Sequence, residues 1–396
     1  MTKTPVYCDY NAGAPIRAEA AVAMSRALAA GGNASSVHSV GRRMRAMIED
    51  ARERIAGALD ASAENVVFTS GATEALHLVL DTFDSYANQA RLRAPVSQHD
   101  LDALDPLPPP SLIVAECEHD ALFEEGKQRF MLRAPLSTSG LVDLETLEAI
   151  VRAAERPALV VVQFANNETG VIQPISKVAA LCREHGALLL VDAAQAFGRI
   201  PVSIADLDAT YLVVSSHKLG GPPGAGALIL APGAPFVTTR FGGGQERGRR
   251  PGTENGAALV GFATAVEWAL KDLGAEAERV TAMRDRFEAA LPKDAIVFGA
   301  DAPRLPNTSN FSLPGLAAET AVIAMDLEGV AISSGAACSS GKVRSSRVLS
   351  SMSVPPDLAK AALRVSFGHE SKDSDVDEAL NALTKVAARR NREAAA

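Results

Sequence analysis

Five short apolar segments, each followed by polar or glycine-containing residues, constrain the fold of this chain most. Helix-like stretches separate them, and this alternation, from about residue 16 to 255, is typical of βα units around a mostly parallel sheet. The strands of such a sheet are buried on both faces, so they are expected to be almost continuously apolar. The pattern predicts strands at 66–68, 112–115, 159–164, 187–191 and 211–214.

The chain after Gly256 has a different pattern. A long apolar helix is predicted to begin there, and it is followed by shorter strands and helices and by a final amphipathic helix. This order predicts a smaller α+β domain beside a large α/β domain. We assign residues 16–255 to the large domain and residues 1–15 and 256–396 to the small one, and we read the proline-rich stretch near 94–111 as a surface excursion.

Composition excludes several classes of protein. The chain has 396 residues, 47% hydrophobic and 22% charged, which is ordinary for a globular protein. A net charge of −8 disfavours sequence-independent binding to nucleic acid, which needs a positive surface. No apolar run is long enough for a membrane span and the first residues lack a signal-peptide pattern, so we expect a cytoplasmic protein. The four cysteines lie far apart, which argues against a disulfide framework and against a metal site.

Two segments point to an anion and to a reactive amine. After the strand at 66–68, the turn Ser70-Gly71-Ala72-Thr73 opens a helix, and the free N–H groups of a helix N-terminus attract anions. Lys218 directly follows the strand at 211–214, beside Ser215 and His217, where a lysine can become a nucleophile for a carbonyl group. Taken singly, Thr73 is also consistent with a helix cap and Lys218 with a structural lysine.

The other strand ends carry polar groups as well. Asp192 needs a cationic or donor partner in its apolar surroundings, and a protonated pyridine nitrogen would serve. Gln195 lies three residues further on, Asn167 follows the neighbouring strand, and the imidazole of His119 could stack on a planar ring. Each residue alone could be purely structural. Because parallel strands end at one sheet edge, their coincidence predicts a pyridoxal 5'-phosphate (PLP) site.

Three further segments complete the candidate site. Cys338 lies among small and polar residues typical of an exposed loop, where a thiolate can react, although an incidental surface thiol is the alternative. Arg364 lies within an apolar strand and needs an anion, either a substrate carboxylate or an internal acid. The basic, glycine-rich stretch around Arg250 and Thr253 could close over a phosphate of a neighbouring subunit or be a solvated loop.

Taken together, these segments resemble the cysteine desulfurases of the NifS/IscS type, in the class V branch of the fold-type I PLP enzymes. The resemblance runs nearly end to end and implies a seven-stranded sheet, a homodimer and a persulfide mechanism. The matching segments, in order, are CDYNAGAP, FTSGATEA, EHDAL, ANNETGVIQPI, VDAAQAFG, SSHKLGGPPGAGAL, GGGQERGRRPGTEN and SSGAACSS.

The resemblance also implies a role for each matching residue. Lys218, His119 and Cys338 are the expected catalytic residues, as covalent cofactor lysine, stacked acid/base and sulfur acceptor. The expected cofactor contacts are Gly71, Ala72, Thr73, His119, Asn167, Asp192, Gln195, Ser215, His217, Lys218 and, from the second subunit, Thr253. Asn11, Asn167 and Arg364 are the expected contacts of the substrate L-cysteine.

The sequence departs from the family pattern at Ala12-Gly13-Ala14, where two threonines are common, and at Gly368-His369, where an arginine often follows the glycine. The predicted activity converts L-cysteine to L-alanine and passes sulfur to an acceptor protein for iron–sulfur cluster assembly or thiolation. The alternatives are a selenocysteine or cysteine-sulfinate lyase or a class V aminotransferase, with Cys338 incidental, and a noncatalytic scaffold or sulfur carrier.

Overall fold

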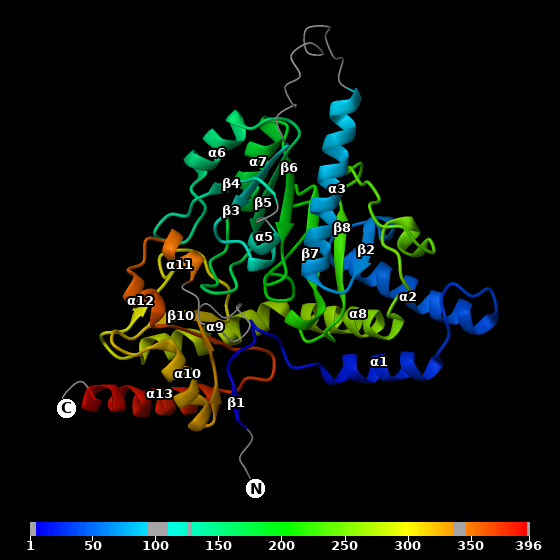
Figure 1. Cartoon of the computed structure of the whole chain (residues 1–396). Helices are drawn as coiled ribbons and strands as arrows, with labels where there is room; N and C mark the ends of the chain where they lie inside the picture. The colour runs from blue at the N-terminus through cyan, green and yellow to red at the C-terminus, as the bar shows by residue number, and fades with distance from the viewer. Residues whose placement is uncertain (1–4, 94–109, 126–128, 336–345, 394–396) are drawn as a thin grey trace.

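A seven-stranded sheet forms the centre of the larger part of the molecule (Figure 1). The computed structural model describes residues 5–93, 110–125, 129–335 and 346–393. All neighbouring strands are parallel except β8, which is antiparallel to both of its neighbours. The order across the sheet is β2 (Val66–Thr69), β8 (Gly226–Leu230), β7 (Tyr211–Ser215), β6 (Leu188–Asp192), β5 (Ala158–Gln163), β3 (Ser111–Ala115) and β4 (Met131–Ala134).

Alternating side chains of each strand enter two cores, one on each face of the sheet. In β5, Val160 and Val162 join one core, while Leu159 and Val161 join the other. The first core is covered by α2 (Ser39–Ala58), α6 (Leu144–Ala153), α7 (Ile175–Glu184) and α8 (Gly256–Lys271), and the second by α3 (Ala72–Arg93) and α5 (Asp120–Glu125). The mostly parallel, two-sided sheet predicted from the apolar segments is confirmed.

A smaller antiparallel sheet belongs to the second part of the fold. It contains β12 (Ser333–Ser334), β13 (Ala362–Ser366), β10 (Thr308–Ser312) and β9 (Ile296–Val297), while β1 (Val6–Tyr7) pairs with β11 (Val330–Ala331). Its core includes Phe287, Phe311 and Phe367, which meet edge to face. The helices around it are α9 (Leu273–Ala289), α10 (Ala318–Leu327) and α13 (Asp373–Glu393).

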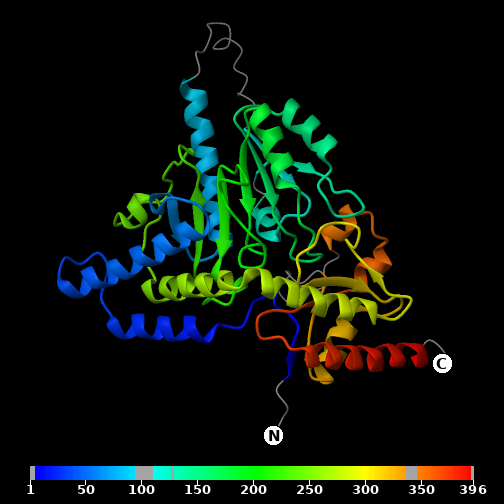
Figure 2. The same cartoon turned by 180° about the vertical axis from the view of Figure 1, so that it is seen from behind.

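Several elements differ from the sequence prediction. The sequence analysis named neither β4 nor β8, and the helix predicted after Gly256 is α8, which is followed directly by a second helix, α9, that the sequence analysis did not name. Figure 2 shows α8 and α9 running end to end along the base of the molecule, beside α1 (Ala18–Ala30). Residues of α8 pack into the first core of the large sheet, and residues of α9 pack into the core of the small sheet. The helix pair therefore joins the two parts of the fold. The domain boundary at residue 255 remains a prediction.

Five short elements complete the fold. They are η1 (Ala63–Asn65), η2 (Ser216–Lys218), η3 (Gln245–Gly248), α11 (Arg347–Ser351) and α12 (Pro356–Lys360). No helix in the described ranges is long and apolar enough to cross a membrane.

Candidate active site

A cavity of about 480 Å³ opens where β2, β3, β5, β6 and β7 end at one edge of the large sheet. Among the described residues, it is lined by every predicted site residue except Thr253. The strands deliver these side chains together because neighbouring parallel strands end at the same edge. Arg364 and Asn11 reach the cavity from the other part of the fold, from β13 and from the segment after β1.

One end of the cavity is suited to a phosphate group. Gly71, Ala72 and Thr73 form the start of the 22-residue helix α3, whose first N–H groups lack partners within the helix. Ser215 faces them, and its hydroxyl is 3.0 Å from Nδ1 of His217. Burial, with the charges of Lys218 and Arg199, lowers the pKa of His217 to about 4, so His217 is neutral near pH 7. This end of the cavity therefore offers hydrogen-bond donors and a helix dipole to an anion.

The phosphate end also depends on a close backbone approach. At Gly226 of β8, a Cβ atom would lie 2.7 Å from the Cα atom of Gly71. Real Cβ atoms do not approach that closely, so only glycine allows β8 to pack against the turn that opens α3.

Lys218 projects from η2 into the same cavity. Its Nζ donates to the carbonyl oxygen of Asn11 at 2.6 Å and to that of Ala12 at 3.0 Å. Both side-chain donors of Asn11 are used inside the protein, by the carbonyl oxygen of Asn167 and the hydroxyl of Thr308. Asn11 therefore contacts Lys218 through its backbone carbonyl oxygen, while the N–H groups of its side-chain amide bind elsewhere in the protein.

The middle of the cavity holds Asp192 and His119. Asp192 is 2% exposed, and its Oδ1 accepts from the N–H of Ala194 at 2.9 Å. Burial raises the pKa of Asp192, although that hydrogen bond and the charges of His119 and Lys218 oppose the shift. Nδ1 of His119 accepts from the N–H of Ala121 at 3.1 Å, which leaves the proton of the neutral ring on Nε2. Burial lowers the pKa of His119.

Arg364 forms the far end of the cavity. It is 1% exposed, donates to Asp9 Oδ1 at 2.6 Å and to the carbonyl oxygen of Asn167 at 3.0 Å. Its Nε is buried and has no hydrogen-bond partner among the described residues. The internal acid that the sequence analysis gave as one interpretation of Arg364 is Asp9, and the substrate carboxylate, the other interpretation, stays a prediction.

One predicted residue of the described chain does not line the cavity. Thr253 is exposed in a neighbouring pocket, which shares Ser70 and Gly224 with the cavity, and its contact with the cofactor of a second subunit stays a prediction. Cys338 lies outside the described residues. The other three cysteines are buried, and burial raises the pKa of each thiol, to about 12 for Cys8 and Cys182. Their protonated thiols are poor nucleophiles.

Sequence reasoning missed two residues of the site. Gln163 ends β5 and lines the cavity; a glutamine in an otherwise apolar strand was the available signal. Glu118, next to His119, is 1% exposed, and neither carboxylate oxygen has a hydrogen-bond partner in the described part of the chain. Burial, and to a smaller extent the charge of Asp192, raises the pKa of Glu118 well above its usual value. No local pattern indicated this burial.

The fold and the site together define an α/β enzyme with a lysine at the strand ends of a seven-stranded sheet. The family model for class-V aminotransferases matches residues 6–103 and 107–379, and the chain belongs to this family, which implies PLP as cofactor. The family expected from the sequence is confirmed.

The most similar relatives carry one activity in their names. The chain is 34% identical over 393 residues to the cysteine desulfurase IscS of Dictyoglomus turgidum, covering 97% of this chain and 95% of that protein. It is 35% identical over 405 residues to an IscS-like cysteine desulfurase of Mycobacterium tuberculosis, covering 98% of each. A NifS-like protein from Rickettsia africae superposes with a TM-score of 0.86 at 27% identity, over 97% of this chain and 99% of that one.

Proposed function

We propose that this chain is a PLP-dependent cysteine desulfurase that converts L-cysteine to L-alanine and takes the sulfur as a persulfide on Cys338. The observation that carries the proposal is a single cavity that holds Lys218, Asp192 and His119 from strand ends of the large sheet together with Arg364 from β13. Cysteine desulfurase relatives match over nearly the full length of the chain, as the sequence analysis expected.

The residues present fit PLP. The start of α3 with Ser215 and His217 would hold its phosphate, together with Thr253 of a second copy. Asp192 would pair with the ring nitrogen and Gln195 with the ring oxygen, while His119 would lie against the ring. When bound, PLP supplies an electron sink for the charge left at the substrate α-carbon after its proton has gone.

The chain's own groups then handle the substrate. Arg364, which lines the cavity and donates from Nη1 to the carbonyl oxygen of Asn167, binds the substrate carboxylate together with Asn167. Lys218 takes and returns protons at the α-carbon, because its amine shares the cavity with Asp192 and His119. His119 carries its proton on Nε2, because Nδ1 accepts from the backbone, and donates a hydrogen bond from Nε2 to the bound substrate.

Sulfur transfer requires a nucleophile that the described cysteines cannot supply, because their thiols are buried. The Cys338 thiolate attacks the substrate sulfur, and an S–S bond forms as the substrate C–S bond breaks. The bonding pair stays on the substrate carbon, which takes a proton and becomes the methyl group of alanine. We further propose a cytoplasmic homodimer that passes this sulfur to an acceptor protein of iron–sulfur assembly or thiolation.

The test compares purified wild type with Lys218→Ala and Cys338→Ala. Wild type should bind PLP with a visible absorption band and should form alanine from cysteine. Lys218→Ala should lose both the band and the activity. Cys338→Ala should keep the band but form no enzyme persulfide, detected by mass spectrometry. Full-rate sulfide release by Cys338→Ala would instead support a lyase, and failure of wild type to bind PLP would refute the proposal.

A further inference from the structure

Arg199 is a cation behind the candidate site that the mechanism above does not use. It follows β6, and its guanidinium donates to the carbonyl oxygens of Gln195 and Tyr10 at 3.0 Å each, and to that of Lys218 at 3.2 Å. It also donates to Oε1 of Gln195. No carboxylate lies within ion-pair distance of Arg199 in the described ranges. Four neutral oxygens thus take the place of an acidic partner.

A guanidinium in this position needs all of these contacts. Burial, and to a smaller extent the charge of Arg364, lowers the pKa of Arg199 to about 9, which still leaves it charged near pH 7. A partly buried charge without a counter-ion is unfavourable unless oxygen atoms replace its hydration. Arg199 therefore restrains the groups that carry those oxygens.

The first restrained group is the amide of Gln195. Because Oε1 accepts from Arg199, Nε2 is turned away from Arg199 and donates to the carbonyl oxygen of Asn11 at 2.9 Å. An amide nitrogen has two hydrogens, so one remains for a ligand in the cavity that Gln195 lines. Arg199 thus selects the amide orientation in which Gln195 acts as a donor toward that ligand.

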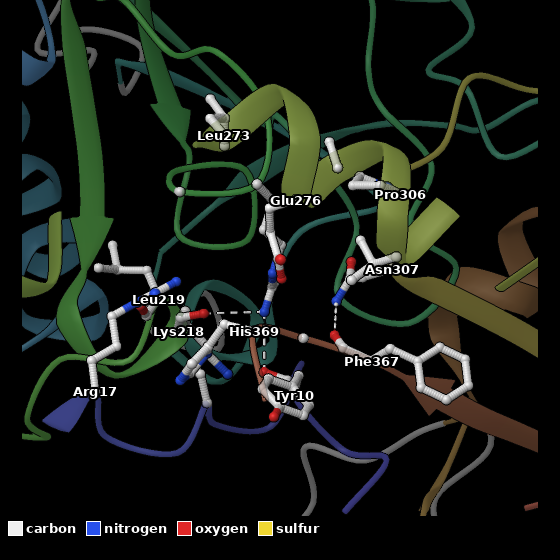
Figure 3. A pocket seen from close by; sticks show the side chains of 16 residues that line it. Tyr10, Arg17, Lys218, Leu219, Leu273, Glu276, Pro306, Asn307, Phe367 and His369 are labelled. Atoms are coloured by element: carbon white, nitrogen blue, oxygen red, sulfur yellow. Dashed lines mark hydrogen bonds between the residues drawn. The ribbon is translucent and has the colours of Figure 1, made fainter. Parts of the chain in front are cut away.

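The second restrained group is the backbone of Lys218. Arg199 holds its carbonyl oxygen from behind, while Nζ reaches the carbonyl oxygen of Asn11 on the cavity side. Figure 3 shows the smaller cavity on this rear side, with Lys218, Leu219 and Arg17 on one side and Tyr10, Phe367 and His369 near its lower edge. Arg199 lines this cavity as well, so it lies between the two parts of the fold.

We propose that Arg199 is a positioning residue that orients Gln195 and the backbone of Lys218 for the cofactor. The inference rests on the proposed function. A shorter or uncharged side chain at residue 199 releases the Gln195 amide to flip and moves the Lys218 backbone. The cofactor then binds more weakly. Loss of the positive charge at residue 199 also favours protonation of the nitrogen through which Lys218 is joined to the cofactor.

The test uses full-length apoprotein titrated with PLP. Arg199→Met should weaken PLP binding by about tenfold or more, the effect of losing charge-assisted hydrogen bonds. The pH at which the visible absorption band of bound PLP is half-converted should rise, because the nearby cation that opposes protonation is lost. Arg199→Lys keeps the charge but cannot reach four oxygens, so its affinity should fall by less and its midpoint should stay near that of wild type.

Two controls separate positioning from general loosening. Arg17→Lys alters the same rear cavity, where Arg17 Nε donates to the carbonyl oxygen of Leu219, and should leave both readouts unchanged. In a Gln195→Met background, Arg199→Met should lose most of its effect on affinity, because the two residues act as one unit.

If Arg199→Met binds PLP with wild-type affinity and keeps the wild-type pH midpoint, the inference is overturned. It is also overturned if Arg17→Lys loses as much PLP affinity as Arg199→Met. If Arg199→Met does not fold, Arg199→Lys serves as the test. A PLP affinity below that of wild type supports the inference, and wild-type affinity overturns it. If wild type itself gives no visible band with PLP, the proposed function fails rather than the role of Arg199.

Discussion

Removing one partner of the buried ion pair between Arg52 and Glu246 should lower the stability of this protein by several kcal/mol. Arg52 lies in α2 and is 3% exposed, and Glu246 lies in η3 and is 5% exposed. The pair is bidentate, with N–O distances of 2.7 and 2.8 Å, and Glu246 also accepts from the N–H of Phe68 at 2.8 Å. The guanidinium carbon lies 4.5 Å from the centre of the Phe68 ring.

Removing Glu246 leaves the buried guanidinium with Glu49, whose carboxylate is 3.3 Å from Nε and largely open to solvent, as its remaining acidic partner. Loss of one partner of such a pair costs about 3–5 kcal/mol, and the unpaired N–H of Phe68 adds to it when the acceptor is lost as well. Glu246→Gln keeps one oxygen for Phe68, so we expect it to lower the free energy of unfolding by about 3 kcal/mol, and Glu246→Ala by more. Arg52→Leu combined with Glu246→Leu should cost less than the sum of the two single changes.

Equilibrium urea denaturation of the apoprotein, followed by circular dichroism, measures these differences without a contribution from bound cofactor. The exposed pair of Arg54 and Glu267 is the matched control, and Glu267→Gln should cost less than about 1 kcal/mol. If Glu246→Gln is no less stable than Glu267→Gln, the buried pair does not hold the segment as described.

The same pair has a consequence for the site. Glu246 and Arg247 adopt left-handed backbone conformations, with φ of 48° and 57°, which non-glycine residues rarely do. The contacts of Glu246 compensate for this strain and anchor the segment that leads to Thr253. If the proposed dimer forms, we therefore expect Glu246→Gln to weaken PLP binding in addition to its effect on stability.

Three other changes give distinct results. Burial raises the pKa of Glu168 to about 7, and because its pKa is lower in the unfolded chain, the native state loses stability as pH rises from about 4.5 to 7. Glu168→Gln should remove this part of the pH dependence and leave the protein up to about 3 kcal/mol more stable than wild type at pH 8, measured by denaturation across that range; an unchanged difference at pH 5 and pH 8 would contradict it. Gly226→Ala should weaken PLP binding by roughly tenfold or more in an equilibrium titration, because its Cβ would meet the backbone of Gly71; native affinity would show that the turn can move. Gly57→Ala, where a Cβ meets nothing within 4 Å near the end of α2, should instead stabilise the protein by up to about 1 kcal/mol without changing PLP affinity, and a fall in its thermal midpoint would contradict this.

Local sequence determined the elements that carry the site. The apolar segments predicted β2, β3, β5, β6 and β7 because a strand buried on both faces must be apolar along its length. The positions of the turn before Thr73 and of the polar groups after each strand were then predicted as well, because each of them directly follows a predicted strand in the sequence. Motif order was sufficient to identify the family.

Only the tertiary structure decided how these groups are supported. Asn11 meets Gln195 and Lys218 across 184 and 207 residues, and Arg199 reaches back to Tyr10 across 189. No local pattern encodes such contacts, because they depend on how distant segments pack. The same reason explains why the burial of Glu118 and the packing of α8 into the first core were not predicted: each depends on which surface the folded chain covers, and not on the residues alongside in sequence.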